Sequence, residues 1–311
     1  MMATPRVFLL DVEGTVAPIS LVSEQLFPYA RTHFPAFLQT HWSDAEVQSD
    51  LALLADENRA EPDPDVPRMF SHPGQLDSPG RVTSRDEPNP DHLLSQPPPV
   101  PHPCDCLPSH GWDTTKPNKP VDRQRPEAKR REVDGPAFGF SAEGAFKPEA
   151  ALAYLLWLMD RDRKSTALKS LQGQIWKAGF ESGELKGTLF ADVPPALKRW
   201  SAHSRVAIYS SGSTSAQQLL FRYSIFGDLT ALIAAYFDTR IGAKTAPASY
   251  AAIAADLRVE PHQVCFFSDV VRELDPAREA GVETRLVTRE GNAPVEDANG
   301  HTAIDSFDAL S

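Results

Sequence analysis

The sequence has 311 residues, of which 41% are hydrophobic, and a formal net charge of −11. This length allows one large or two smaller domains with a substantial core. The acidic excess argues against a general nucleic-acid or anionic-membrane surface but allows a local basic pocket for a small phosphorylated substrate. No apolar stretch approaches a signal core or a membrane span, and three cysteines do not form a disulfide framework. We expect a monomeric cytoplasmic protein that binds neither nucleic acid nor membrane.

An apolar run near the start of the chain ends in two carboxylates. Residues 7–10 are predicted to form a buried strand, and Asp11 and Glu13 follow it, one residue apart. Ionised carboxylates are costly to bury unless they are paired or bound to metal, so the pair indicates a cation site at the end of the strand. Residues 11–14 could equally form a solvated turn, because Asp and Gly are common in turns. This segment taken alone leaves both interpretations open.

The next part of the chain is predicted to be mainly helical. Apolar residues recur at helical spacing over residues 26–54, and again over 149–159 and 168–176. Between them, residues 57–140 contain 17 of the 28 prolines and few apolar residues. Such a composition buries too little apolar surface to offset the entropy of ordering. The sequence therefore predicts a helical module over about residues 20–186, interrupted by a disordered Pro-rich insert.

The insert contains residues that could in principle bind a ligand. A zinc site would use His102, Cys104, Cys106 and His110, but their spacing is not that of a zinc finger. The basic run at residues 129–131 is short and is followed by an acid, which fits a solvated linker better than a targeting or nucleic-acid patch.

The last third of the chain alternates strands with helices. Strands are predicted at residues 205–209, 264–267 and 284–287, with helices between them. Short, continuously apolar strands separated by helices are typical of a parallel sheet that is covered on both faces. The predicted fold class is α/β, with a Rossmann-like parallel sheet as its core.

Polar residues follow three of the predicted strands. Asp11 and Glu13 end the first strand, Ser210 and Ser211 the second, and Asp269 the third. Ligands of parallel sheets bind beyond the carboxyl ends of the strands. Carboxylates there suit Mg²⁺, and serines at the start of a helix can bind phosphate.

A lysine completes this charge pattern. Lys244 lies between the second and third of these strands, where a surface position would be the ordinary interpretation of a single lysine. An ammonium group at the site would offset the charge of a phosphate and of an attacking carboxylate, on which phosphoryl transfer depends.

The order of these residues resembles the haloacid dehalogenase superfamily. Its signature is a nucleophilic Asp with a second acid two residues on, a strand ending in Ser or Thr, a Lys, and a strand ending in an acid. Within it, the chain resembles the bifunctional enolase-phosphatase family of methionine salvage, and Glu13 at the second acid position is typical of that family. The closer resemblance is carried by residues 11–15, 18–20, 26–30, 171–176, 183–187, 209–217 and 236–244.

The resemblance implies a role for each of these residues. Asp11 would be the nucleophile, and Glu13 would protonate the leaving group and then activate water. The implied ligands of Mg²⁺ are Asp11, Glu13 and Asp269, and the implied substrate-binding residues are Ser210, Ser211 and Lys244. The implied substrate is 2,3-diketo-5-methylthiopentyl-1-phosphate, which is enolised and then dephosphorylated to the acireductone 1,2-dihydroxy-3-keto-5-methylthiopentene. The sequence does not identify the enolisation base.

The resemblance also implies a division into domains. Residues 1–19 and 187–311 would form the catalytic core, and residues 20–186 a helical cap interrupted by the insert at about 57–140. Two other functions stay open. The chain could be a phosphatase of the same superfamily for another small phosphorylated metabolite, or a non-catalytic protein whose Pro-rich segment binds a partner.

Overall fold

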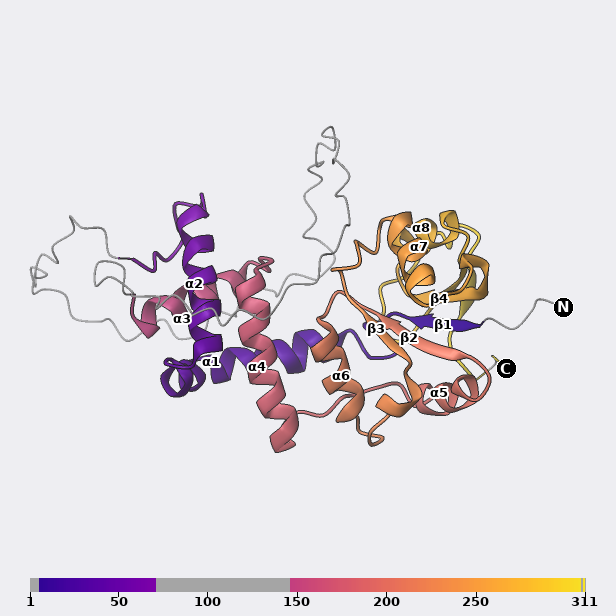
Figure 1. Ribbon diagram of the computed structural model, residues 1–311, viewed down its shortest axis with the longest axis horizontal. Coiled ribbons are helices and arrows are strands. Elements are labelled where there is room, and N and C mark those ends of the chain that lie inside the picture. Colours follow the sequence, from indigo (N-terminus) through magenta and orange to yellow (C-terminus); the bar gives the residue numbers. More distant parts are fainter. Residues whose placement is uncertain (1–5, 71–145, 309, 311) are drawn as a thin grey trace, which may run out of the picture. The chain divides into compact units, whose positions relative to one another are not determined.

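A computed structural model of the chain describes residues 6–70, 146–308 and 310 (Figure 1). The described residues on the two sides of the gap at 71–145 belong to one compact unit. Most of the Pro-rich insert lies outside the described residues, as do the candidate zinc ligands His102, Cys104, Cys106 and His110 and the basic run at 129–131.

A six-stranded parallel sheet organises the last third of the chain around the first strand (Figure 1). Its order is β3-β2-β1-β4-β5-β6. The strands are β1 (Val7–Leu10), β2 (Arg205–Tyr209), β3 (Ala235–Phe237), β4 (Val264–Ser268), β5 (Glu283–Val287) and β6 (Thr302–Ile304). Because β1 pairs with β2 on one side and β4 on the other, the chain order reverses there, which is where parallel sheets bind ligands. The predicted strands and the α/β fold class are confirmed, whereas β3 and β6 were not predicted.

Helices cover both faces of the sheet. Phe8 and Leu10 pack with α5 (Val193–Ser201) and α6 (Thr214–Arg222) in one hydrophobic cluster. Val7 and Leu9 pack with α7 (Pro247–Asp256) and α8 (Val271–Glu279) in another. Successive side chains of a strand point to opposite faces, so a continuously apolar strand is what this two-sided burial requires.

The helical segment has a hydrophobic cluster of its own. The segment consists of the π-helix η1 (Leu21–Leu26) and the helices α1 (Phe27–His41), α2 (Ala45–Ala60), α3 (Pro148–Asp160) and α4 (Thr166–Ser182). Buried residues of α1 to α4 pack against one another in a cluster separate from the two that cover the sheet. None of the helices among the described residues combines the length and the apolar character that crossing a membrane requires.

The start of the insert was predicted too early. The prediction placed it at about Glu57, but α2 continues to Ala60, and Asn58 is buried. The Asn58 amide donates to the Pro67 carbonyl oxygen at 2.9 Å and accepts from the Met69 N–H at 3.0 Å. Val66 and Met69 are buried in the cluster of the helical segment. These two apolar residues and one buried amide help to order residues 57–70, although the proline-rich composition of the whole segment hides them.

Candidate active site

Asp11 lies at the carboxyl end of the central strand. Its backbone N–H donates to the Phe267 carbonyl oxygen at 2.9 Å, which continues the pairing of β1 with β4. Its side chain is buried, and its Oδ1 accepts from the Val12 N–H at 2.7 Å. The strand therefore presents the Asp11 carboxylate at the point where the strand order reverses.

Lys244 is buried against this carboxylate. Its Nζ lies 2.5 Å from Asp11 Oδ1 and 2.8 Å from Glu273 Oε2. Burial by itself would lower the pKa of Lys244, but the two carboxylates outweigh it and raise this pKa. The Tyr250 hydroxyl lies 2.7 Å from the Lys244 carbonyl oxygen and 2.9 Å from that of Glu273, and so holds the two segments together. Lys244 is a charged residue of the site, and the interpretation as a surface lysine is wrong.

The turn after β1 packs directly against Asp269. Gly14 has φ +70°, and a Cβ at this position would come within 2.2 Å of Asp269 Oδ2. Only glycine combines this left-handed conformation with the space that the carboxylate needs. The turn that carries Glu13 and the residue that follows β4 are thus adjacent, as the order of the strands predicted.

The acidic groups at this edge perturb one another. Burial raises the pKa of Asp11 to about 7, with Lys244 offsetting part of the effect and Glu273 and Glu13 adding to it. Burial also raises the pKa of Asp269 to about 6, and the charges of Glu273 and Glu13 contribute. Burial raises the pKa of Glu13 as well. The carboxylates of Asp11, Glu13, Asp269 and Glu273 therefore share one neighbourhood with Lys244.

Ser210 and Ser211 begin the loop between β2 and α6. Ser210 is buried and accepts from the Gly212 N–H at 3.1 Å through its Oγ, whereas Ser211 is exposed. Ser213 caps α6 by accepting from the Ala216 N–H at 3.2 Å. Backbone N–H groups at the first turn of a helix favour anions, so this loop can receive a phosphate.

Three polar residues of the site were not predicted from the sequence. Glu273 stands four residues after Asp269, in the first turn of α8, and contacts Lys244. The Ser268 hydroxyl lies 3.0 Å from Glu273 Oε2 and 3.4 Å from Asp11 Oδ2. Gln217 donates through Nε2 to the carbonyl oxygens of Gly212 (2.8 Å) and Phe237 (2.9 Å), which fixes the serine loop. An acid only four residues after Asp269, which follows a predicted strand, is the signal that could have found Glu273.

A pocket of about 180 Å³ adjoins the site. Its polar wall includes Glu13, the loop 210–213, and Lys169 and Gln172 of α4. The remaining wall is mostly apolar and comes from η1, the start of α1, α4 and α6: Leu21, Val22, Leu26, Phe27, Trp176, Phe180, Ala216 and Leu220. A molecule with a charged end and an apolar tail fits this division.

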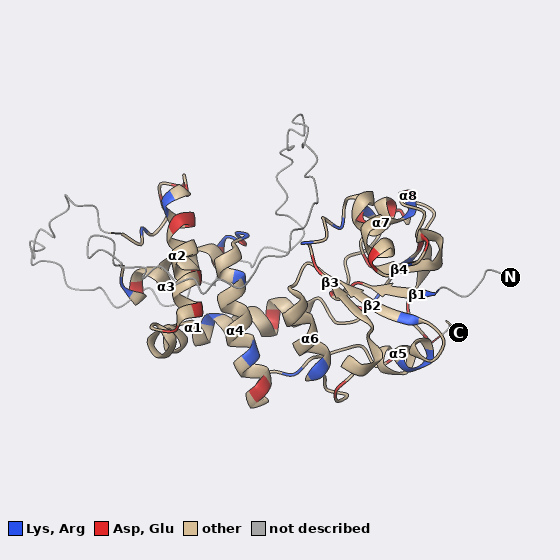
Figure 2. Ribbon diagram, in the orientation of Figure 1, with Lys and Arg blue, Asp and Glu red and all other residues tan. Residues whose placement is uncertain are grey.

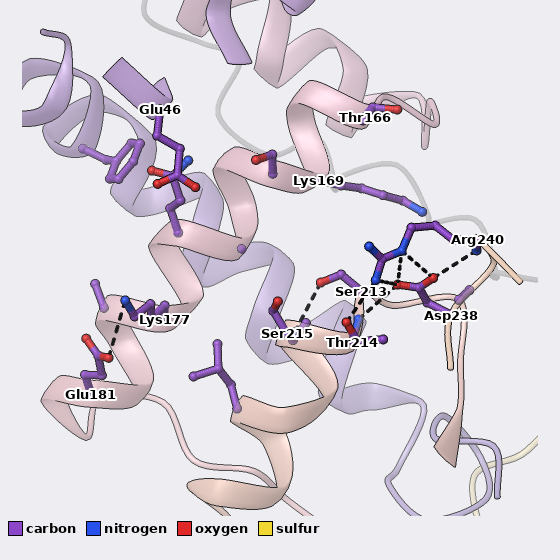
Figure 3. A pocket seen from close by; sticks show the side chains of 18 of the residues that line it. Glu46, Thr166, Lys169, Lys177, Glu181, Ser213, Thr214, Ser215, Asp238 and Arg240 are labelled. Carbon is purple, nitrogen blue, oxygen red and sulfur yellow. Dashed lines mark hydrogen bonds and ion pairs between the residues drawn. The ribbon is translucent and has the colours of Figure 1, made fainter. Parts of the chain in front are cut away.

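A larger pocket of about 810 Å³ shares Lys169, Ser211, Ser213 and Ala216 with the smaller one. Figure 3 shows it between α4, the start of α6 and the loop that carries Asp238 and Arg240. Arg240 Nε lies 2.9 Å from both carboxylate oxygens of Asp238. This ion pair closes one side of the larger pocket, while Glu13 lines only the smaller pocket.

Comparison with known proteins agrees with this geometry. A family model described as haloacid dehalogenase-like hydrolase matches residues 119–281. The fold and the site thus define a hydrolase of the haloacid dehalogenase-like class.

Full-length relatives narrow the class to one family. Enolase-phosphatase E1 of Synechococcus elongatus is 41% identical over 303 residues, covering 97% of this chain and 96% of that protein. Enolase-phosphatase E1 of Danio rerio is 34% identical over 308 residues, covering 98% and 94%. The crystal structure of the UTR4 protein of Saccharomyces cerevisiae superimposes with a TM-score of 0.63 at 29% identity and covers 99% of this chain and all of that one. The chain belongs to the enolase-phosphatase E1 family, as its resemblance predicted, and is a phosphatase.

Proposed function

We propose that the chain converts 2,3-diketo-5-methylthiopentyl-1-phosphate to the acireductone 1,2-dihydroxy-3-keto-5-methylthiopentene and phosphate, as an enolase-phosphatase of methionine salvage. The observation that carries the proposal is the contact of Asp11 with Lys244 at the carboxyl end of β1, next to a pocket with one polar and one apolar wall. The identity of 41% with an enolase-phosphatase E1 over nearly the whole chain supports it.

Asp11 is the proposed nucleophile. After enolisation of the substrate, an oxygen of its carboxylate attacks phosphorus, and the bond between phosphorus and the oxygen of carbon 1 breaks. The aspartyl-phosphate that results is a known form of covalent catalysis by carboxylates. Lys244 favours the ionised carboxylate needed for the attack, because it opposes the effect of burial on the pKa of Asp11.

Glu13 is the proposed acid and base. It lines the small pocket, as Ser210 and Gly212 do, and the leaving oxygen would lie within its reach there. It would give its proton to that oxygen and later take one from the water that hydrolyses the aspartyl-phosphate. Burial raises the pKa of Glu13, which favours a protonated acid at the first of these steps.

The acidic cluster fits a divalent cation. Among the described residues, no group of three or more His, Cys, Asp or Glu side chains is arranged to hold a metal ion by itself. Burial raises the pKa values of Asp11 and Asp269, and Lys244 offsets only part of this effect, so a further positive charge would favour the ionised carboxylates. Mg²⁺ is bound by a few protein oxygens and keeps water in its remaining positions. Asp11, Glu13 and Asp269 would therefore hold it together with water molecules. When bound, it would neutralise charge on the phosphoryl oxygens.

The serine loop and the helical segment complete the proposed site. Ser210 and Ser211 would donate to phosphate oxygens together with the N-terminus of α6. Residues 20–186 would act as the cap, with residues 1–19 and 187–311 as the core, because the helical segment has its own hydrophobic cluster and supplies the apolar wall of the pocket. A closed cap would exclude water from the aspartyl-phosphate until the leaving group departs.

One assay with two readouts tests the proposal. The purified chain is given the diketo phosphate with Mg²⁺, and enol formation is followed by absorbance while phosphate is measured chemically. We expect both signals, and a loss of phosphate release of about 10⁴-fold or more in Asp11→Asn. Phosphate release without an enol would indicate a phosphatase for another metabolite. A wild-type protein no more active than Asp11→Asn would indicate a non-catalytic protein.

A further inference from the structure

Two glutamines line the small pocket, and both are buried. The side-chain amide of Gln217 donates to two backbone carbonyl oxygens and thereby supports the serine loop. Gln172, on α4, is 4% exposed, and its side chain has no hydrogen-bond partner among the described residues. Gln217 therefore supports a loop through its amide N–H groups, whereas Gln172 has no such structural role.

The polar atoms of Gln172 are not enclosed by protein. They are absent from the fully buried side-chain atoms that lack a partner, and Gln172 lines the small pocket, so its amide is open to that pocket and can bind a ligand there. Leu171 and Ile175, close by on the same helix, are buried in the hydrophobic cluster of the helical segment, so α4 is anchored independently of Gln172. The amide of Gln172 is thus held in place on the wall of the pocket, with its hydrogen-bonding capacity unused.

Lys169 lies one helical turn before Gln172 and lines the same pocket. Figure 3 shows its side chain extending from α4. Lys169 and Glu13 both line this pocket, so the ammonium group and the carboxylate belong to the same site. On α4, the polar wall therefore offers two groups that donate hydrogen bonds, three residues apart on one side of the helix.

We propose that Gln172 is a substrate-binding residue that donates a hydrogen bond from its amide to the oxygen of carbon 2 in the vicinal diketone, with Lys169 beside it to contact the neighbouring oxygen and add positive charge. This inference rests on the proposed function. Two adjacent carbonyl oxygens are acceptors only, and two adjacent donors match them. In enolisation a general base takes the proton from carbon 1, and the electron pair of the broken C–H bond forms the C1=C2 double bond. The π pair of the C2=O bond moves onto the oxygen of carbon 2, which then takes up a proton, so this oxygen carries the charge that a donor would stabilise.

The test compares Gln172→Leu with Gln174→Leu. Gln174 lies on the same helix and donates to Asp50 Oδ2 at 3.0 Å, away from the small pocket. Lys169→Met is paired in the same way with Lys177→Met, because Lys177 lines only the larger pocket. The rate of enol formation from the diketo phosphate and the free energy of unfolding are measured for every variant.

We expect Gln172→Leu to slow enol formation about 10- to 100-fold, as the loss of one hydrogen bond to a developing charge predicts. Its free energy of unfolding should stay close to that of wild type, since the amide of Gln172 faces the pocket and no hydrogen bond within the described residues is lost. Lys169→Met should also slow enol formation, and the two control variants should leave its rate within about twofold of wild type.

Two results would overturn the inference, and a third would remove its basis. Equal enol rates for Gln172→Leu and Gln174→Leu would show that the amide does not contact the substrate. A loss of rate with a matching loss of stability would assign Gln172 a structural role. If wild type forms no enol at all, the proposed function itself fails, and this is seen before any variant is compared.

Discussion

Two ion pairs with the same separation of 2.5 Å occur in different surroundings. Lys244 contacts Asp11 at the edge of the sheet, and Arg31 contacts Asp160 between α1 and α3. The first two side chains are 9% and 6% exposed, and the second two 45% and 53%. Attraction between charges and the cost of leaving one unpaired both increase as water is excluded. Burial, rather than distance, should therefore decide what each pair contributes.

The helical segment carries mostly pairs of the exposed kind. Figure 2 shows Lys and Arg interspersed with Asp and Glu along α1 to α4. These charges face water, and the segment is held together by its apolar cluster. At the edge of the sheet, by contrast, the charged groups of Asp11 and Lys244 are buried, and each is stabilised by the other.

Lys244→Met should have the largest effect. It leaves Asp11 and Glu273 buried without their cation, and removing one partner of a buried pair typically costs about 3–5 kcal/mol. We expect a loss of this size in the free energy of unfolding at pH 7, measured by urea denaturation with EDTA present so that no metal replaces the missing charge. Phosphate release should be lost as well.

The matched control for Lys244→Met is the double variant with Glu273→Gln. It removes one of the two repelling carboxylates and should recover part of the lost stability. A Lys244→Met variant as stable as wild type would show that the buried charges at the edge of the sheet are not coupled. The buried pair would then contribute no more to stability than the exposed pairs of the helical segment.

Asp192→Asn probes a pair that is buried but lies outside the proposed chemistry. Asp192 accepts from the Phe307 N–H (2.7 Å), Arg289 Nη1 (2.8 Å) and the Ser306 hydroxyl (3.2 Å). Burial would raise the pKa of Asp192, but these donors outweigh it and lower this pKa below its ordinary value. The substitution should cost about 1.5–3 kcal/mol at pH 7, because hydrogen bonds to a charged group are lost.

The pH dependence of this cost has a definite sign. Since the pKa of Asp192 is lower in the folded than in the unfolded state, its stabilisation is fully present above the unfolded value of about 4. It disappears as the pH falls through the folded value. Urea denaturation of wild type and Asp192→Asn should therefore give a difference that shrinks below about pH 4. A difference that stays constant down to about pH 3 would mean that the carboxylate charge is not what stabilises this cluster.

The sequence predicted the parts of the site that local patterns determine. Asp11, Ser210 and Asp269 each follow a short apolar run, and the rule that parallel strands present their carboxyl ends at one edge was sufficient to bring them together. Glu273 was missed because it reaches Lys244 from a helix that the sequence pattern did not reveal. Lys244 was assigned to the site by the order of the residues and by the resemblance, but its burial was not predicted, since it stands in a loop without periodicity and is enclosed by residues distant in the sequence.

The fold was predicted least well where its elements are short. β3 and β6 have three residues each and are partly exposed, so their apolar pattern is too brief to distinguish from a loop. The end of α2 was placed too early because composition averaged over a long segment outweighed the two apolar residues that anchor it. Gln172 illustrates the same limit, because an unpaired side chain can be recognised only when its surroundings are known.

Arg31→Ala should have the smallest effect and completes the comparison. Its guanidinium approaches both carboxylate oxygens of Asp160, at 2.5 and 3.4 Å, which is good geometry for an exposed pair. A double-mutant cycle with Asp160→Ala should nevertheless give a coupling below about 1 kcal/mol. This coupling should weaken further in about 1 M salt, where exposed charges are screened within roughly 3 Å. If it approached the value for Lys244 and were insensitive to salt, distance and geometry would matter more than burial, and the explanation given for the edge of the sheet would fail with it.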